Sequence, residues 1–276
     1  MIPFNNGLPP RKFFPCYEYE MNRILIWFSC GIASAVAAYK TLLKYGQLES
    51  VSHFPITVEL LYCDTLAYEH PDNPRFMKEV STWLNRPIKI LKSTEYTDIY
   101  DVFERERFLR GPKGARCTTE LKKRLRWDYE RPGDLHIFGF TAEEEGRFAR
   151  NKEENPDILT EFILENTSKQ ECMDIVKRTG IETPMMYKMG YPNNNCRGCV
   201  KAESVAYWTH IRQDWPEIFN KMAVLERKLN FALNRKGSGD NRKPLFLDQI
   251  PPGVKKMKKG LDFECGVLCS TPTKEK

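Results

Sequence analysis

Along the first 167 residues, short apolar runs alternate with longer segments in which apolar residues recur every three or four positions. Short unbroken runs are typical of strands buried on both faces, and the periodic segments are typical of helices. The alternation predicts a mainly parallel sheet with helices on both faces, an α/β fold of the Rossmann-like kind. The expected strands are 23–28, 58–63, 87–91, 135–140 and 161–164, and the expected helices are 33–45, 73–84, 96–109 and 118–129. In the helix 73–84, Asn73 is expected at the N-cap and Pro74 at the first helical position.

The pattern changes after residue 167, where strand-like runs give way to helical periodicity. Two helical segments, 168–179 and 201–234, flank the polar loop 189–199, and a tail rich in Gly, Pro, Lys and Asp follows. These shifts predict an irregular arm over 1–20, an α/β domain over 21–167, and a helical region with a cysteine-containing tail over 168–276.

The composition is that of a globular protein, with 41% hydrophobic and 29% charged residues among 276. No apolar run approaches the roughly 20 residues needed to span a bilayer, and the N-terminus lacks the pattern of a secretory signal. We therefore expect a cytoplasmic protein without a membrane partner, and a homo-oligomer stays open. The net charge of +6 suits an anionic ligand, nucleic acid included, and equally an ordinary soluble surface.

The end of the first expected strand is the strongest candidate for a ligand site. Ser29, Cys30 and Gly31 form a turn of small residues between that strand and the next helix. This arrangement points backbone N–H groups and a helix N-terminus at an anion. Gly31 permits close approach of the backbone, and Ser29 and Ser34 add hydroxyl groups. The alternative is a tight strand–helix turn that binds nothing.

Nine cysteines are the unusual feature of the composition. An odd number without a signal peptide argues against a secreted disulfide framework. Cys196 and Cys199 form a CxxC pair in a loop of Asn and Gly residues, which tolerate unusual backbone angles. A soft thiolate set suits an iron–sulfur cluster or zinc, and the spacing does not separate the two.

Four motifs, in matching order and spacing over about residues 23 to 150, resemble known sequence elements. The stretch IWFSCGIAS at 26–34 resembles the PP-loop of the adenine nucleotide alpha hydrolase superfamily, usually written SGGxDS. The other three resemble the second element of that superfamily and two elements of the phosphoadenosine phosphosulfate (PAPS) reductase family. They are Asp64-Thr65 with the later Glu69, Arg116-Cys117 with Lys122, and Gly139-Phe140-Thr141 with Arg147.

The resemblance implies that the chain binds an adenine nucleotide, which would be PAPS, adenylylsulfate or ATP. By this resemblance Ser29, Gly31 and Ser34 would cradle phosphate or sulfate, and Asp64 and Thr65 would border the nucleotide. The remaining candidates near the anion are Arg116, Lys122, Gly139 and Arg147.

The cysteines extend the resemblance to adenylylsulfate reductases, in which a cysteine pair and a later CxxC hold a [4Fe-4S] cluster. Cys117, Cys196 and Cys199 match three of the four ligands, whereas Thr118 replaces the other member of the pair. Cys265 or Cys269 in the tail would supply the fourth ligand of a cluster or of a zinc ion. Alternatively, Cys265 resembles the family's nucleophile, which takes the sulfonate and releases sulfite after attack by a thiol of a thioredoxin- or glutaredoxin-like reductant.

Three departures from the family pattern keep other functions open. Cys30, Ala33 and Leu66 stand where relatives usually carry Gly, Asp and Gly. Loss of the loop Asp removes one carboxylate ligand for Mg²⁺, which weakens the case for ATP cleavage and leaves Asp64 as a candidate ligand. The main expectation is a PAPS reductase-like enzyme of thiol-dependent sulfur chemistry. The alternatives are an ATP-dependent sulfur-modifying enzyme acting on tRNA or DNA with an Fe–S cluster, and a non-catalytic nucleotide-binding protein with structural zinc.

Overall fold

The computed structural model describes residues 23–50, 56–111, 114–237 and 241–257. The expected N-terminal arm and the tail residues Cys265 and Cys269 lie outside the described residues. No helix of the described part is long and apolar enough to cross a membrane.

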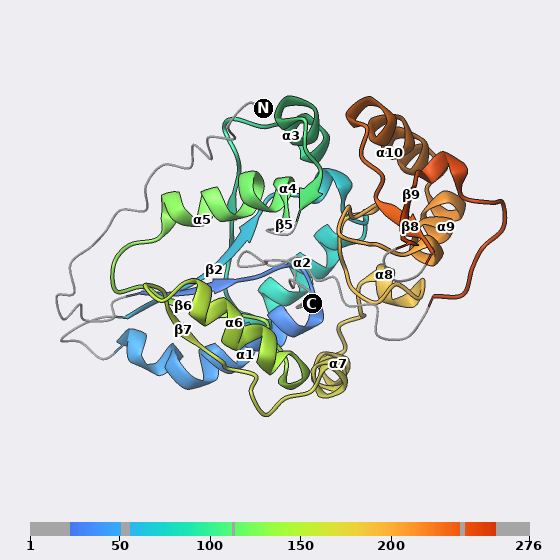
Figure 1. Cartoon of the computed structure of the whole chain (residues 1–276). Coiled ribbons are helices and arrows are strands. Elements are labelled where there is room, and N and C mark those ends of the chain that lie inside the picture. The colour runs from blue at the N-terminus through green and yellow to red at the C-terminus, as the bar shows by residue number, and fades with distance from the viewer. Residues whose placement is uncertain (1–22, 51–55, 112–113, 238–240, 258–276) are drawn as a thin grey trace.

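The expected parallel sheet is present and contains five strands (Figure 1). Their order across the sheet is β3-β2-β1-β6-β7, and every neighbouring pair is parallel. The fold class predicted from the sequence is therefore confirmed. The last strand lies slightly earlier in the chain than expected. The strands are β1 (Arg23–Trp27), β2 (Thr57–Cys63), β3 (Ile88–Leu91), β6 (Leu135–Phe138) and β7 (Leu159–Glu161).

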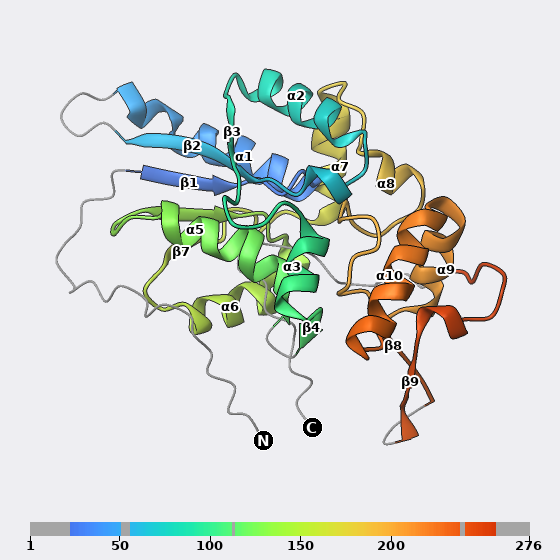
Figure 2. The same cartoon turned by 90° about the horizontal axis from the view of Figure 1, so that it is seen from above.

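Helices cover both faces of this sheet, as Figure 2 shows from above. One layer contains α1 (Ile32–Tyr45), α2 (Asn73–Leu84) and α7 (Lys169–Arg178). The opposite layer contains α5 (Arg124–Tyr129) and α6 (Glu145–Glu154). Alternate residues of β1 serve the two layers: Ile24 and Ile26 pack toward α1, and Leu25 and Trp27 pack toward α5 and α6. Burial on both faces explains why the strands are continuous apolar runs in the sequence.

Three expected elements differ in detail. The helix expected over 96–109 is shorter, α3 (Ile99–Glu106), and ends where Arg107 adopts a left-handed backbone with φ of 50°. The helix expected over 118–129 begins at α4 (Arg116–Thr118) and passes through a π-helical turn, Thr119–Lys123, before α5. Asn73 is not the N-cap of α2. Asp72 occupies that position, and the Asn73 side chain is buried.

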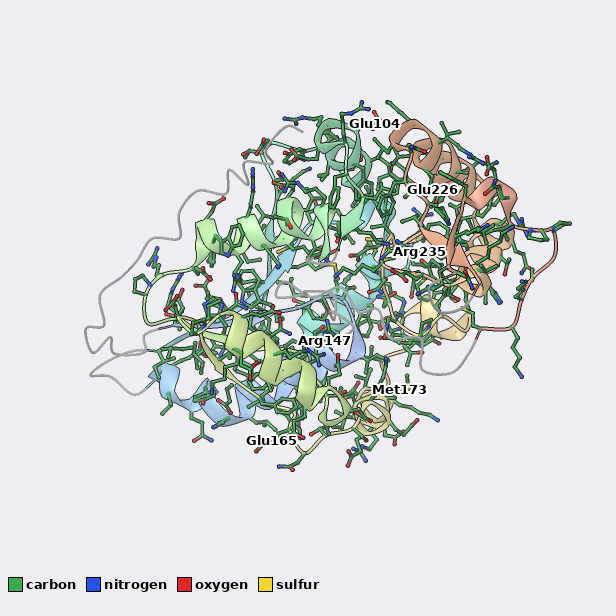
Figure 3. The ribbon with its side chains drawn as sticks, in the orientation of Figure 1. Glu104, Arg147, Glu165, Met173, Glu226 and Arg235 are labelled. Atoms are coloured by element: carbon green, nitrogen blue, oxygen red, sulfur yellow. The ribbon has the colours of Figure 1, made fainter. Side chains whose placement is uncertain are left out.

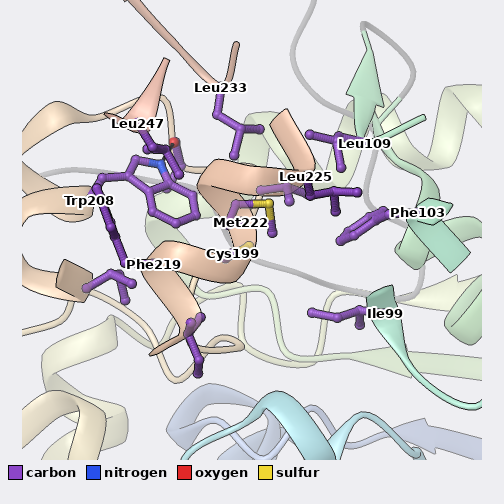
Figure 4. Close-up of a cluster of buried hydrophobic side chains, with 14 of the residues drawn as sticks. Ile99, Phe103, Leu109, Cys199, Trp208, Phe219, Met222, Leu225, Leu233 and Leu247 are labelled. Carbon is purple, nitrogen blue, oxygen red and sulfur yellow. Dashed lines mark hydrogen bonds between the residues drawn. The ribbon is translucent and has the colours of Figure 1, made fainter. Parts of the chain in front are cut away.

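The region after the sheet has a hydrophobic core of its own, to which α3 also contributes (Figure 4). The single helix expected over 201–234 is divided at Trp215, and Pro216 starts the second half. A two-stranded antiparallel hairpin follows, which the sequence pattern did not predict. The elements are α8 (Met185–Lys188), α9 (Val205–Asp214), α10 (Pro216–Leu229), β8 (Asn234–Lys236) and β9 (Lys243–Leu245).

Short elements complete the described chain. A two-residue pair, β4 (Arg110–Gly111) with β5 (Gly114–Ala115), precedes α4. Single 3₁₀ turns cover η1 (Gly46–Ser50), η2 (Leu66–Tyr68), η4 (Ala142–Glu144) and η6 (Leu247–Gln249).

Candidate active site

A cleft opens at the carboxyl ends of β1 and β6, in the middle of the sheet. From β1 the chain builds outward to β2 and β3, and it later returns to place β6 on the other side of β1. Ligands of open parallel sheets bind at such a reversal of strand order. The cleft encloses about 990 Å³, including space open to solvent, and is lined by the turn after β1, the end of β6 and the loop that precedes Cys196.

The turn after β1 has the geometry of an anion cradle. The Ser34 hydroxyl donates to the carbonyl of Gly31 at 2.9 Å and accepts from the N–H of Ser29 at 3.1 Å, which closes the turn. Gly31 precedes α1, and no described side chain caps this helix N-terminus. The first residues of α1 line the cleft, so its uncapped N–H groups and positive dipole end are available to an anion.

Gly139 allows the end of β6 to touch this turn. A Cβ atom on Gly139 would lie 2.6 Å from the backbone nitrogen of Ser34 and 2.7 Å from its Cα. Both are backbone atoms of α1, which cannot rotate away. The close approach of β6 to the start of α1 therefore requires glycine at position 139.

Cys30 takes a backbone conformation that favours glycine. Its φ is 59°, in the left-handed region that most side chains avoid. The side chain is fully buried, with Sγ 3.7 Å from the carbonyl of Asn73. Burial, and then the negative charges of Glu69 and Asp72, raise the pKa of the Cys30 thiol. Cys30 is thus a neutral packing group and not a nucleophile.

Three cations from three different elements reach the cleft. Lys122 comes from the π-helical turn, Arg147 from α6 and Lys169 from α7. Arg147, labelled in Figure 3, pairs with Glu144 and lies 5.1 Å above the ring of Phe140. The Lys169 ammonium donates to Asn193 Oδ1 at 2.6 Å. Sequence reasoning missed Lys169, although it directly follows Ser168, the N-cap of α7.

Six predicted nucleotide-binding residues line the cleft: Ser29, Gly31, Ser34, Lys122, Gly139 and Arg147. Asp64, Thr65 and Arg116 are not among the described lining residues. Arg116 is paired with Glu106 and, at 3.0 Å, with Glu120. Asp64 accepts from the N–H of Leu66 at 3.2 Å. Glu69, not Asp64, is the carboxylate that lines the cleft.

Glu69 is the centre of a buried polar network. It accepts from the Thr65 hydroxyl and from Asn73 Nδ2, each at 2.6 Å. Asn194 Nδ2 donates onward to Asn73 Oδ1 at 2.9 Å and to the carbonyl of Cys30 at 2.7 Å. The network therefore ties the turn after β1 to the loop that carries the CxxC pair.

One buried atom on the cleft wall, Asn194 Oδ1, has no hydrogen-bond partner among the described residues. Tyr62 lines the same wall, with its buried hydroxyl next to Thr65 and Glu69. Burial and the nearby Glu69 charge raise the pKa of Tyr62, which keeps its hydroxyl protonated. Buried polar groups are seldom left unpaired, so Asn194 Oδ1 is a candidate to contact a bound ligand or ordered water.

The CxxC loop is held between the two cores. Cys196 lines the cleft, whereas Cys199 is buried in the C-terminal core (Figure 4). The Tyr207 hydroxyl accepts from the N–H of Cys199 at 2.9 Å and donates to the carbonyl of Cys196 at 3.3 Å. Gly198 turns the loop with φ of 75°, and a Cβ there would lie 2.8 Å from Ile218.

The described residues do not by themselves complete a metal site. Cys117 packs against the core that contains Cys199, but no three His, Cys, Asp or Glu side chains of the described part are grouped closely enough to hold a metal ion. The fourth candidate ligand, Cys269, and the alternative, Cys265, lie outside that part. The ligand set Cys117, Cys196, Cys199 and Cys269, for a cluster or zinc, stays a prediction.

Comparison with known proteins gives a limited result. No protein-family model matches the chain, and no curated protein matches it. Among solved structures it is similar to U34-tRNA thiolase NcsA from Methanococcus maripaludis with its [4Fe-4S] cluster. The TM-score is 0.40 and the sequence identity 10%, over 76% of this chain and 72% of that chain. A likeness of this size carries no conclusion about the chemistry of this chain, which rests on its own residues.

Proposed function

We propose that the chain is an adenine-nucleotide-dependent sulfur-transfer enzyme that modifies nucleic acid. The observation that carries the proposal is that Cys196 and the anion cradle after β1 line one cleft. A thiol beside a nucleotide site suits chemistry in which the nucleotide activates an acceptor and sulfur then replaces the activating group. Substrate orientation in such a reaction comes from the enzyme's fixed groups.

The roles of the residues follow from their places. Ser29, Ser34 and the N-terminus of α1 would bind phosphate oxygens, and Lys122, Arg147 and Lys169 would neutralise their charge. Glu69 supplies a carboxylate at the cleft although position 33 is alanine. With its remaining lone pairs, Glu69 could accept a hydrogen bond from a water ligand of a nucleotide-bound Mg²⁺. The acceptor oxygen would attack the α-phosphorus and take the adenylyl group with release of pyrophosphate. A hydrosulfide ion supplied from solution and admitted beside Cys196 would then attack the activated carbon, and the oxygen would leave as part of AMP.

Calorimetric titration with Mg–ATP, PAPS and adenylylsulfate tests the nucleotide. We expect Mg–ATP to bind, and Lys169→Met to weaken its binding about tenfold, because one charge-assisted contact is worth about 1.5 kcal/mol or more. Binding of PAPS or adenylylsulfate without binding of ATP would contradict the proposal.

Incorporation of sulfur into unfractionated tRNA or DNA, followed by mass spectrometry of the nucleosides, tests the reaction. We expect Cys196→Ser to abolish ATP-dependent incorporation while nucleotide affinity stays within about twofold. Cys172→Ala is the matched control, because Cys172 is buried between α1 and α7 and burial raises the pKa of its thiol to about 12. Equal activity of both variants would remove Cys196 from the reaction.

A second candidate function is a reductase of sulfonucleotides such as PAPS. Ala33 favours it, because sulfonate reduction by a thiol needs no Mg²⁺ carboxylate in the turn, and the three cations suit a ligand with both sulfate and phosphate. Its nucleophile would be Cys265, with a thioredoxin- or glutaredoxin-like reductant. Release of sulfite from PAPS, lost in Cys265→Ser, would select this function over sulfur transfer to nucleic acid.

A further inference from the structure

The β8–β9 hairpin concentrates positive charge away from the cleft. Arg235, Lys236, Arg242 and Lys243 are all exposed on it. Arg242 has one long ion pair, 3.8 Å to Glu203. The side chains of the other three make no hydrogen bond or ion pair to a described residue. Figure 2 shows the hairpin projecting from the C-terminal region, and Figure 3 labels Arg235 on it.

The charges on the hairpin oppose its own folding. Lys236 and Lys243 are directly paired across the two strands, and like charges in that position are destabilising. The base of the hairpin is secured separately, because Asn234 and Leu245 are buried. Among the described contacts of the four cations, one long ion pair of Arg242 stands against the direct repulsion of Lys236 and Lys243. Like charges that lower the stability of an element without stabilising contacts in exchange are typical of a functional surface.

We propose that this hairpin binds the phosphate backbone of the nucleic acid on which the cleft acts; the choice of acceptor rests on the proposed function. A row of exposed cations on a narrow two-stranded ribbon, with one long ion pair among them, suits a repeating polyanion. A lipid surface is less suitable, because none of the exposed large apolar residues of the described part lies on the hairpin to insert among the lipids.

The test measures binding of a fluorescein-labelled RNA stem-loop, and of a DNA duplex of the same sequence, by anisotropy at several salt concentrations. The variant is Lys236→Gln/Lys243→Gln. The matched control is Lys152→Gln/Lys177→Gln, which removes two exposed cations from the α/β domain. We expect the hairpin variant to lose about tenfold or more in affinity and the salt slope to fall by about 1.5, as for two lost phosphate contacts. The control should change little.

Thermal unfolding separates this result from misfolding. Neutralising Lys236 and Lys243 removes their repulsion, so the melting temperature should stay the same or rise while binding falls. Equal losses in the hairpin variant and the control would overturn the proposal. So would hairpin-dependent binding to phosphatidylserine vesicles or to polyglutamate with no hairpin-dependent binding to RNA or DNA. Titration of the same preparations with Mg–ATP distinguishes failure of the hairpin proposal from failure of the proposed sulfur-transfer function. The hairpin variants should retain nucleotide affinity whatever reaction the cleft performs.

Discussion

The two sides of the cleft are built by different means. On the side of β1 and β6, backbone geometry shapes most of the site: a three-residue turn closed by the Ser34 hydroxyl, a helix N-terminus and the contact of Gly139 with α1. On the side of the CxxC loop, single side chains fix the backbone: the buried Asn194 and Tyr207, and the partly exposed Arg197, which donates to the carbonyl of Ala67. The side of β1 and β6 is therefore held rigid by the sheet. The side of the CxxC loop depends on a few hydrogen bonds, so single substitutions can alter it.

Substitution of Gly139 by alanine should have the largest effect on this comparison. The added Cβ would meet the backbone of Ser34 at 2.6 Å, and forced overpacking of this kind costs about 3 kcal/mol. We expect a marked drop in the free energy of unfolding and loss of measurable nucleotide binding. Chemical denaturation and calorimetry measure the two effects.

Gly146→Ala is the control for Gly139→Ala. Gly146 lies in α6, and a Cβ there would meet no atom within 4 Å. Alanine in a helix interior is favoured over glycine by about 0.5–1 kcal/mol, so this variant should be slightly more stable than the wild type. If Gly139→Ala behaved in the same way, the rigid contact between β6 and α1 would not exist in solution.

Glu226 should make the stability of the C-terminal region depend on pH. It is fully buried and accepts from the N–H groups of Leu233 and, at 2.6 Å, Leu247. Burial raises the pKa of its carboxyl from 4.5 to about 7. Because the folded pKa lies above the unfolded one, this contribution to the free energy of unfolding is full below pH 4.5 and is lost as the pH rises through 7.

The expected loss between pH 4.5 and 7 is about 2 kcal/mol, measured as the difference between wild type and Glu226→Gln. An amide does not titrate, so the variant should lose this part of the pH dependence. Glu217→Gln, on the exposed side of the same helix, is the control and should follow the wild type. Parallel pH curves for all three proteins would show that Glu226 titrates normally.

The sheet could be predicted from sequence because its strands are buried on both faces. Each strand is a continuous apolar run, and the helices between them are periodic. The C-terminal region was less predictable, since its elements depend on partners distant in sequence. The β8–β9 hairpin is short and polar, and its base is fixed by Glu226 across the chain. No local pattern carries that information.

The candidate site also contains residues that local sequence predicts and residues that only the fold brings together. Residues in the turn after β1 follow from local sequence, and six of the nine predicted nucleotide-binding residues line the cleft. Asp64, Thr65 and Arg116 were expected there from the resemblance of their motifs. The chain instead turns Asp64 toward the N–H of Leu66 and pairs Arg116 with Glu106 and Glu120. Glu69, which belongs to one of these motifs, lines the cleft. Lys169 and Asn194 reach it through tertiary packing, which a single sequence does not display.

Asn194→Ala should produce the smallest effect and the most informative one, because Asn194 joins the two sides of the cleft. Its amide donates to the carbonyl of Cys30 at 2.7 Å and to Asn73 Oδ1 at 2.9 Å. Loss of the bond to Cys30, which holds the turn after β1, costs about 1 kcal/mol, so nucleotide affinity should fall about fivefold. Loss of the bond to Asn73 adds to a small drop in melting temperature. Asn194→Asp should be worse than alanine, because a carboxylate cannot donate and would face that carbonyl oxygen. Asn166→Ala, at an exposed position, is the control. A lower melting temperature with unchanged nucleotide affinity would mean that Asn194 only packs the loop and does not connect the CxxC side to the nucleotide side.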